Sequence, residues 1–288
     1  MRRGIHSITI AAPAKINLSL RILGKRPDGF HEIETLMAPL RLADEIEISH
    51  APGGEVALEC NDPDLPNGPG NLCVKAALAF REATGLDHGV RISLMKRIPH
   101  GAGLGGGSSD AASVLKGLNE ISDHPLVDGE LHQIASTLGS DVPFFLHGGP
   151  AWCRGRGEML EAAPALPARS LLLIKPPFPV PTAWAYKRHA ELKESPGSPR
   201  EETPQRLDGV AIFNDLEESV FSKYLLLPVM KTWLRGQEGV ESSFMTGSGS
   251  TMVAVMDPDS PEASMNAIRE KIAVEFGTSM RVLRTGWA

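Results

Sequence analysis

Glycine and serine residues gather in the segment 98–113, which reads IPHGAGLGGGSSDAAS and holds five glycines between positions 101 and 107. Glycine has no Cβ, so this backbone can turn through positive φ and approach a ligand closely. Ser108 and Ser109 are good N-cap residues, and the residues after them have the spacing of a helix with an apolar stripe. The unpaired N–H groups and the dipole at the start of a helix attract an anion. The segment therefore predicts a phosphate-binding loop that leads into a serine-capped helix.

The residues that this segment lacks argue against two well-known kinds of phosphate-binding loop. A Walker A loop would have a lysine after Gly107, and this chain has none there. A dinucleotide-binding loop would be followed about 20 residues later by an acidic residue after a second strand. Here Glu120 and Asp123 follow a helical segment instead. A flexible glycine linker is the structural alternative, although linkers rarely precede an amphipathic helix. We therefore expect a phosphate loop of a third kind.

The composition of the whole chain limits the kinds of protein that it could be. A length of 288 residues favours two lobes, because single cores stop growing at roughly 250 to 300 residues. The net charge of −6 argues against a nucleic-acid surface. Cys60, Cys73 and Cys153 are odd in number and widely spaced, which indicates reduced thiols and neither a disulfide framework nor a zinc site. Because no apolar run is long enough to span a bilayer, we expect a cytoplasmic protein.

Hydrophobic patterning predicts the strands and helices that must position the loop. Alternating or β-branched segments predict strands over 5–23, 44–50, 55–60, 90–98, 170–176 and 280–285. Helical periodicity predicts helices over 71–85, 128–139, 182–192, 220–236 and 261–277. The segment 193–205, rich in proline, serine and charge, is expected to be a mobile surface loop. Strands and helices mixed without regular βαβ spacing indicate an α+β fold.

Three motif segments follow one another in a definite order: APAKINLSL near the start, IPHGAGLGGGSSDAA in the middle and MTGSGSTMVAV near the end. This order resembles the superfamily of small-molecule kinases named after galactokinase, homoserine kinase, mevalonate kinase and phosphomevalonate kinase (GHMP kinases). Residues 99–109 resemble its central motif. Within the superfamily, the segments 13–37, 138–149 and 154–160 are similar to the branch that phosphorylates a cytidyl diphosphate alcohol, and the likeness covers nearly the full chain.

The resemblance implies a two-lobed GHMP kinase fold with the active site in the cleft between the lobes. An N-terminal ATP-binding lobe of the ribosomal-S5-domain-2-like type would span residues 1–165, and a C-terminal ferredoxin-like lobe residues 166–288. The implied reaction transfers phosphate from ATP to the 2-hydroxyl of a cytidyl diphosphate derivative of methylerythritol, in the non-mevalonate route to isopentenyl diphosphate. Mg²⁺ is expected with ATP, but the sequence does not identify its ligands.

Three other functions are alternatives to phosphorylation of a cytidyl diphosphate alcohol. Another GHMP kinase, of the homoserine or mevalonate type, would lack a nucleobase pocket. A catalytically silent sensor of ATP or of a metabolite could use the same fold, but it would not need a catalytic pair. RNA binding by an S5-like lobe is opposed by the acidic charge balance. We therefore expect small-molecule ligands only, with no nucleic-acid or membrane partner, on a monomer or weak homodimer.

By resemblance, Lys15 and Asp141 form the catalytic pair. A carboxylate within hydrogen-bond reach can accept the proton of the attacking alcohol, which contributes about 10²- to 10⁴-fold in rate. A neighbouring ammonium would orient that carboxylate and offset charge on the transferred phosphoryl group. The structural alternatives are a turn or helix cap for Asp141 and a solvated strand residue for Lys15. Asn17, two positions along the strand from Lys15, should face the same side and meet the same substrate.

The resemblance implies that three further residues bind the cytosine base of the substrate. Phe30 would stack on cytosine, His31 would hydrogen-bond its polar edge, and Tyr186 would stack on the other face. The family often has tyrosine where this chain has Phe30, which keeps the stacking but removes a hydroxyl. The structural alternatives are a core aromatic for Phe30 and a surface position for His31.

The ATP site is assigned by resemblance to the central loop and to residues near it. Its expected members are Asn71, Leu72, Lys96, Pro99, His100, Gly101, Ala102, Gly103, Leu104, Gly105, Gly106, Gly107, Ser108 and Ser109. Lys96 could equally be a solvated strand charge. Asp110 would repel a phosphate beside it, so it should either face away or help to hold magnesium. Gly247, Ser248 and Gly249 are expected to form a tight turn near the phosphates or the substrate, or a purely structural strand turn.

Overall fold

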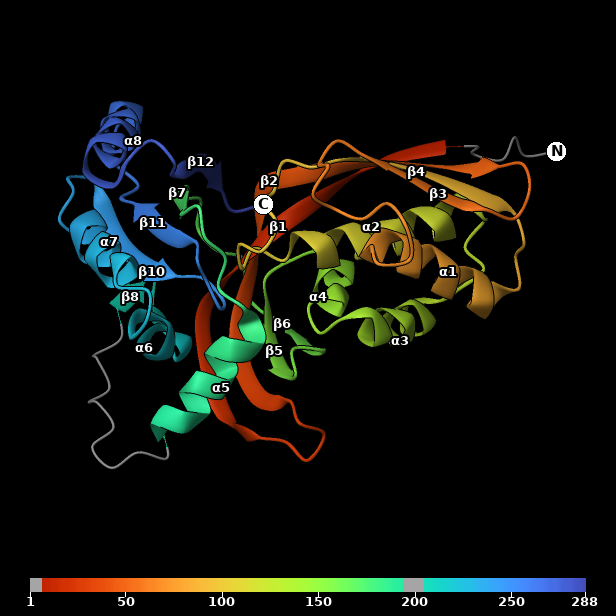
Figure 1. Ribbon diagram of the computed structural model, residues 1–288, viewed down its shortest axis with the longest axis horizontal. Helices are drawn as coiled ribbons and strands as arrows, with labels where there is room; N and C mark the ends of the chain where they lie inside the picture. Colours follow the sequence, from red (N-terminus) through yellow and green to blue (C-terminus); the bar gives the residue numbers. More distant parts are fainter. Residues whose placement is uncertain (1–6, 194–204) are drawn as a thin grey trace.

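A computed structural model of the chain describes residues 7–193 and 205–288, which form two lobes of mixed strands and helices (Figure 1). The expected α+β class is therefore confirmed. The mobile loop predicted over 193–205 falls almost wholly on residues 194–204, which lie outside the described residues. In residues 7–193 and 205–288, none of the helices combines the length and apolar character that a membrane crossing needs.

Two long antiparallel strands, β1 (Ser7–Lys25) and β2 (His31–Ala51), form the centre of the first sheet. The order of its main path is β3-β4-β2-β1-β9-β8, with β3 (Val56–Cys60), β4 (Gly89–Met95), β8 (Gln205–Leu207) and β9 (Val210–Asn214). A hairpin of β5 (Ala151–Gly155) and β6 (Met159–Ala162) also pairs with β2. The β1–β2 register shifts on both sides of Lys15 and Asn17, and such bulges redirect side chains.

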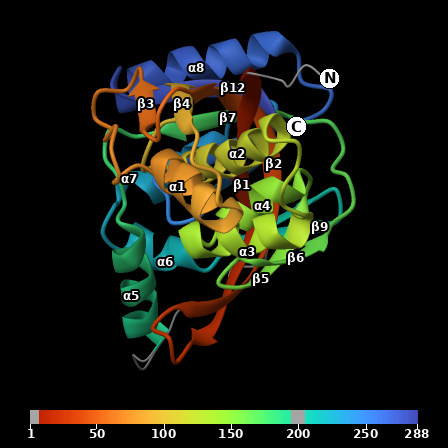
Figure 2. The same ribbon diagram turned by 90° about the vertical axis from the view of Figure 1, so that its right-hand side faces the viewer.

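Four helices cover one face of this sheet: α1 (Leu72–Thr84), α2 (Gly106–Ile121), α3 (Asp128–Leu138) and α4 (Val142–His147). Figure 2 looks onto these helices, with β1 and β2 behind them. The predicted helices over 71–85 and 128–139 are confirmed, and Gly85 closes α1 in the left-handed conformation. The helix after the glycine loop is α2, so the loop is fixed at the point where this helical layer meets β1.

The second sheet is antiparallel, in the order β10-β11-β7-β12: β10 (Val240–Met245), β11 (Met252–Met256), β7 (Ser170–Lys175) and β12 (Arg281–Gly286). The helices of this half are α5 (Thr182–Lys193), α6 (Leu216–Phe221), α7 (Leu226–Arg235) and α8 (Glu262–Phe276). The single helix predicted over 220–236 is wrong. Two helices form instead, because Pro228 lacks an N–H and fits only the first turn of α7.

A shared hydrophobic core joins the two sheets. Ala14, Ile16 and Leu18 of β1 are fully buried in one cluster with Leu171 and Leu173 of β7 and other residues of the second sheet. The middle of β1 therefore packs against both lobes. Lys15 and Asn17, which alternate with these apolar residues, are in this way placed at the junction of the lobes.

Candidate active site

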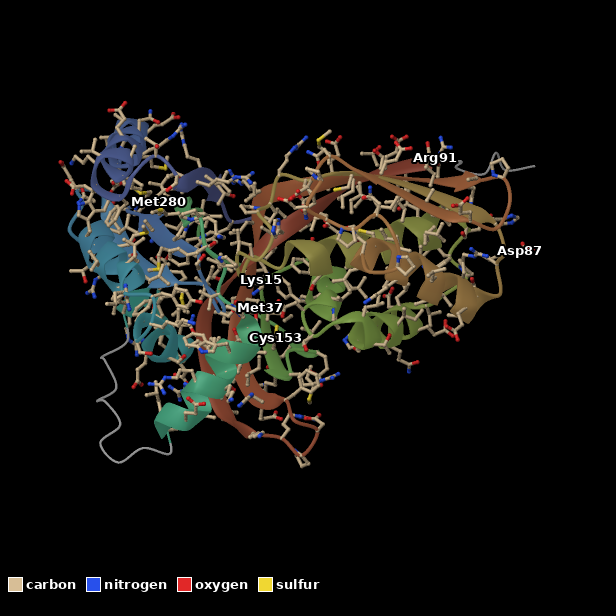
Figure 3. The ribbon with its side chains drawn as sticks, in the orientation of Figure 1. Lys15, Met37, Asp87, Arg91, Cys153 and Met280 are labelled. Carbon is tan, nitrogen blue, oxygen red and sulfur yellow. The ribbon has the colours of Figure 1, made fainter. Side chains whose placement is uncertain are left out.

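A cavity of about 730 Å³ lies where the two lobes meet. Figure 3 shows two of its lining residues, Lys15 and Met37, in this central position. The charged and polar side chains that line it are those of Lys15, Asn17, Lys25, His31, Ser108, Ser140, Asp141, Arg156, Thr182, Tyr186, Lys187 and Ser248. Among the described lining residues, one carboxylate therefore faces four lysine or arginine side chains. This charge balance suits a polyanionic ligand.

Lys15 and Asp141 lie next to each other in the cavity wall. Nζ of Lys15 is 3.4 Å from Oδ2 of Asp141 and donates a 2.7 Å hydrogen bond to Oδ1 of Asn17. The Lys15 side chain is only 5% exposed, so it is not a solvated strand lysine, whereas that of Asp141 is 30% exposed. Asp141 occupies the N-cap position of α4, yet its side chain makes no capping hydrogen bond. The alternative of a side-chain cap is therefore wrong. The Asp141 carboxylate instead pairs with Lys15 and lines the cavity.

Asn17 is held by hydrogen bonds from both lobes. Its Nδ2 donates to Oγ1 of Thr35, and its backbone N–H donates to Oγ1 of Thr246, both at 2.9 Å. The expectation that Asn17 faces the same side as Lys15 is confirmed by the hydrogen bond between them. Sequence reasoning missed Thr35 and Thr246. Thr246 lies within the third motif segment, and that position is the signal that could have found it.

The glycine loop is packed tightly between β1 and the turn that joins β10 to β11. A Cβ on Gly103 would lie 2.7 Å from the carbonyl oxygen of Thr246, and one on Gly105 would lie 2.9 Å from Cγ of Lys15. The backbone N–H of Lys15 also donates to the carbonyl oxygen of Leu104 at 2.9 Å. Only glycine allows approaches this close. The expected tight turn at Gly247 is confirmed, and Gly247 and Ser248 line the cavity.

The start of α2 differs from the prediction. The expected serine cap is wrong, because α2 begins at Gly106 and its N-cap residue is Gly105, with φ +70°. Ser108 and Ser109 therefore lie in the first turn. Ser108 lines the cavity, whereas Ser109 is fully buried and its Oγ has no hydrogen-bond partner among the described residues. A glycine N-cap with no side-chain cap leaves the first N–H groups of α2 for an anion.

The residues predicted for ATP take up different positions around this loop. Gly103, Gly105 and Ser108 line the cavity. Ala102 and Leu104 point into the core that joins the sheets, so only their backbone is near the loop surface. The remaining predicted positions are Pro99, His100, Gly101, Gly106, Gly107 and Ser109, which belong to the same loop and the first turn of α2.

The start of α1 touches the same loop. Asn71 is the N-cap of α1, since its Oδ1 accepts a hydrogen bond from the N–H of Cys73. Leu72 Cδ1 lies 3.6 Å from the place that a Cβ on Gly107 would occupy. Two helix N-termini therefore lie near one segment of backbone.

Lys96 is neither solvated nor open to the cavity. Its side chain is 6% exposed, and its Nζ forms ion pairs with Oδ2 of Asp44 and, at 2.7 Å, with Oδ2 of Asp110. Asp110 thus points to Lys96 and does not line the cavity, which agrees with the expected position away from a bound phosphate. Asp44 also accepts hydrogen bonds from the N–H groups of Arg97 and Ile98, at 2.5 and 2.8 Å. We call Asp44, Lys96 and Asp110 the buried triad.

Burial sets the charge of this triad. Loss of hydration and the nearby Asp44 carboxylate together outweigh the attraction of Lys96 and raise the pKa of Asp110 to about 7. Burial lowers the pKa of Lys96, but the Asp110 and Asp44 carboxylates more than reverse this and raise it. The ammonium of Lys96 is therefore retained, and the Asp110 carboxyl can hold a proton up to about neutral pH.

Aromatic and imidazole rings form the other end of the cavity. His31 stacks on Tyr186 with ring centroids 5.0 Å apart and planes 28° apart. Phe30, with 49% of its surface exposed, is not a core aromatic. Burial lowers the pKa of His31, and so do His189 and Lys25, which favours an uncharged imidazole with one N–H donor and one acceptor. Nε2 of His31 is buried without a hydrogen-bond partner among the described residues.

Comparison with known proteins gives the class that this fold and site define. The family model for the N-terminal domain of GHMP kinases matches residues 71–149. A crystal structure of homoserine kinase from Cytophaga hutchinsonii, 18% identical, superposes with a TM-score of 0.67 over 100% of this chain and 96% of that chain. That likeness shows the fold alone. The fold and the matched domain therefore define the class of GHMP kinases.

More similar relatives identify the family within that class. The 4-diphosphocytidyl-2-C-methyl-D-erythritol kinase of Methylacidiphilum infernorum (isolate V4) is 47% identical over 90% of each chain. That of Geobacter sp. (strain M21) is 38% identical over 96% of this chain and 99% of its own length. A crystal structure of 4-(cytidine 5'-diphospho)-2C-methyl-D-erythritol kinase, 34% identical, superposes with a TM-score of 0.79 over 98% of this chain and 99% of that chain. The chain belongs to the family of 4-diphosphocytidyl-2-C-methyl-D-erythritol kinases.

Proposed function

We propose that this kinase transfers the γ-phosphoryl group of ATP to the 2-hydroxyl of 4-diphosphocytidyl-2-C-methyl-D-erythritol, in the non-mevalonate route to isopentenyl diphosphate. The observation that carries the proposal is the Lys15–Asp141 pair at 3.4 Å, in the wall of a cavity that also contains the glycine loop and the His31–Tyr186 stack. One cavity thus offers a base, a phosphate loop and a nucleobase end. The names of the relatives described above agree with that combination.

In the proposed reaction, Asp141 accepts the proton of the attacking hydroxyl. The alcohol oxygen then forms a bond to the γ-phosphorus, the bond from that phosphorus to the bridging oxygen breaks, and ADP leaves. Lys15, hydrogen-bonded to Asn17, orients the carboxylate and offsets negative charge on the transferred group. Asn17 itself is fixed by Thr35 and Thr246, so the pair is held in one geometry before the substrate arrives.

For ATP, we propose that the backbone of residues 99–109 and the first turn of α2 hold the phosphates. The N–H groups at the uncapped start of α2 suit that role. Asn71 and Leu72 at the start of α1 would contact the nucleoside. For Lys96, the proposal is limited to its backbone and to support of the loop, because its ammonium is engaged by two carboxylates.

Magnesium normally neutralises charge on the β- and γ-phosphates. The described residues include no group of three or more histidine, cysteine or acidic side chains that could hold a metal, and Asp141 is the one carboxylate in the described cavity wall. Within residues 7–193 and 205–288, the histidine, cysteine and acidic side chains thus do not make a metal site of their own. We therefore expect Mg²⁺ to reach the cavity on the phosphate oxygens of ATP, as is common for this ion, and assign it no protein ligand.

For the substrate, we propose that cytosine binds at the aromatic end. Phe30 and Tyr186 offer ring faces for stacking, and His31 offers an uncharged imidazole for the polar edge of the base. Such a reaction uses small diffusible molecules, and we propose that it takes place in the cytoplasm.

The experiment that tests the function is ADP release from Mg·ATP by the purified protein. The cytidyl methylerythritol substrate, homoserine and mevalonate are supplied in parallel reactions. We expect turnover with the cytidyl compound alone. Turnover with homoserine or mevalonate would overturn the proposed substrate, but it would not contradict the proposed role of the glycine loop in binding ATP. ATP binding without turnover of any alcohol would instead favour a metabolite sensor.

A further inference from the structure

Arg156 is a cavity residue whose role neither the motifs nor the catalytic pair explains. It lies in the turn between β5 and β6, inside the segment RGRGEML. Its guanidinium carbon is 4.8 Å from the centroid of the Phe30 ring, which is a cation–π contact. Its side chain is 29% exposed and lines the cavity. Its ion pair with Glu158 is long, with Nε 3.9 Å from Oε1, and the Asp28 carboxylate also lies within electrostatic range.

The turn that carries Arg156 also touches the catalytic end of the cavity. Gly157, the next residue, has φ +121°. A Cβ there would lie 3.4 Å from the carbonyl oxygen of Ser140 and 3.8 Å from Oδ1 of Asp141. On its other side, the N–H of Gly155 donates to Oε1 of Glu32, which follows His31 in β2. The turn therefore spans the distance from the proposed nucleobase residues to the proposed base.

The chemistry of the proposed substrate suits a cation in that position. In a cytidine diphosphate ester, the diphosphate lies between the base and the alcohol, and it is the only strongly charged part. The turn that carries Arg156 places its guanidinium against Phe30 and the backbone of Gly157, the next residue, near Asp141. Guanidinium is planar and presents paired N–H donors, so it matches phosphate oxygens better than ammonium does.

We propose that Arg156 binds the diphosphate of the substrate and thereby selects cytidine diphosphate esters over uncharged cytidine compounds. This inference rests on the proposed function. The Phe30 ring holds the guanidinium beside the place where the base stacks, so the same ring contacts both parts of the ligand. Lys25 and Lys187 also line the cavity, but neither has a contact to an aromatic ring of the nucleobase end among the interactions described.

The test compares cytidine, CMP and CDP as ligands of the wild-type protein and of Arg156→Met, by calorimetry in the presence of ADP. We expect the variant to bind CDP about 10- to 100-fold more weakly, because charge-assisted hydrogen bonds to phosphate are lost. Binding of cytidine should change less than twofold. Arg156→Lys should recover part of the loss. In turnover assays, the Michaelis constant for the cytidyl substrate should rise while that for ATP stays the same.

The matched control is Arg154→Met. Arg154 lies two residues away in the same hairpin, is paired with Glu34 and Glu161, and does not line the cavity. Its loss should leave CDP binding unchanged, and thermal unfolding should show that both variants fold. Equal weakening of cytidine and CDP in Arg156→Met, or unchanged CDP binding, would overturn the inference. Absence of wild-type turnover would overturn the proposed function instead, because the binding comparison needs no catalysis.

Discussion

Two lysine–aspartate clusters flank the glycine loop, and they differ in what surrounds them. Lys15 is 5% exposed and its partner Asp141 is 30% exposed, in the wall of the cavity. Lys96 is 6% exposed, and its partners Asp44 and Asp110 are 0% and 4% exposed. Both lysine side chains lie close to loop glycines: a Cβ on Gly105 would be 3.1 Å from Cε of Lys15, and a Cβ on Gly106 would be 3.2 Å from Nζ of Lys96.

The two clusters differ in access and not in the type of ion pair, and access would separate the proposed reactive cluster from a structural one. A carboxylate that is partly open can meet a hydroxyl, whereas one enclosed by protein can only hold its neighbours. Asp44 holds the segment that leads from β4 into the glycine loop, because it accepts hydrogen bonds from the N–H groups of Arg97 and Ile98. The buried triad would therefore support the loop, and the open pair would perform the chemistry.

The largest effect should follow from Asp141→Asn. Asparagine keeps the shape of the side chain but cannot accept the proton, so we expect turnover to fall by about 10²- to 10⁴-fold. ADP affinity and the thermal unfolding temperature should stay close to the wild-type values, since the Asp141 side chain makes no capping hydrogen bond. Steady-state kinetics and calorimetry measure these quantities. Undiminished turnover would remove Asp141 from the role of base.

Lys96→Met should damage stability more than any change to the open pair. It leaves two buried carboxyls without their cation, and breaking a buried ion pair costs about 3–5 kcal/mol. Urea unfolding measures the loss. The matched variant is Lys15→Met, which leaves Asp141 partly hydrated and should cost far less stability while abolishing most activity. Equal losses of unfolding free energy in the two variants would contradict the view that the buried triad is structural and the Lys15–Asp141 pair is not.

Gly105→Ala tests how closely the loop must approach the open pair. The new Cβ would lie 2.9 Å from Cγ of Lys15 and from Cζ of Phe145, at a residue with φ +70°. We expect kcat to fall by about ten- to a hundredfold, because Lys15 must shift. Gly148→Ala is the control, since Gly148 has φ +81° with no atom within 4 Å of its Cβ position. A similar fall in kcat for Gly148→Ala would attribute the effect to backbone strain.

The smallest expected effect is a change in how stability depends on pH. The pKa of Asp110 is about 7 in the folded chain, against an ordinary value of 3.8. Between about pH 4 and pH 7 the folded protein therefore holds more protons than the unfolded chain, and stability falls as the pH rises. Asp110→Asn should reduce this slope, whereas an unchanged slope would show that Asp110 does not titrate in this range. Urea unfolding at several pH values in this window measures the difference.

The sequence supports prediction where the signal is local. Five glycines before a helical pattern indicate a phosphate loop, and the two-residue spacing of Lys15 and Asn17 places both on one side of a strand. Asp141 is different, because its surrounding residues are typical of a turn, and only resemblance to a family assigns it a role. Its approach to Lys15 depends on the packing of α4 against the first sheet, which no local pattern encodes.

Other features could not be predicted because their partners are far away in the chain. Lys96 follows an alternating strand and looks solvated, but Asp44, 52 residues earlier, encloses it. Asn214 is buried and donates hydrogen bonds to the carbonyl oxygens of Met245 and Gly247 at 2.8 Å, which supports the β10–β11 turn. It lies in β9, a strand of five residues, and no periodic signal marks so short an element.

The pairing of β9 with β1 affects when, during synthesis of the chain, the protein can first become active. Ser19 and Leu20 pair in parallel with Phe213 and Asn214, and Asn17 depends on Thr246. A nascent chain that has emerged only as far as residue 165 has the proposed catalytic lysine and aspartate but neither of these contacts. Because domains tend to fold from the N-terminus as they emerge, β1 must wait with an unpaired edge for partners made much later. ATP turnover should therefore begin only when translation is nearly complete.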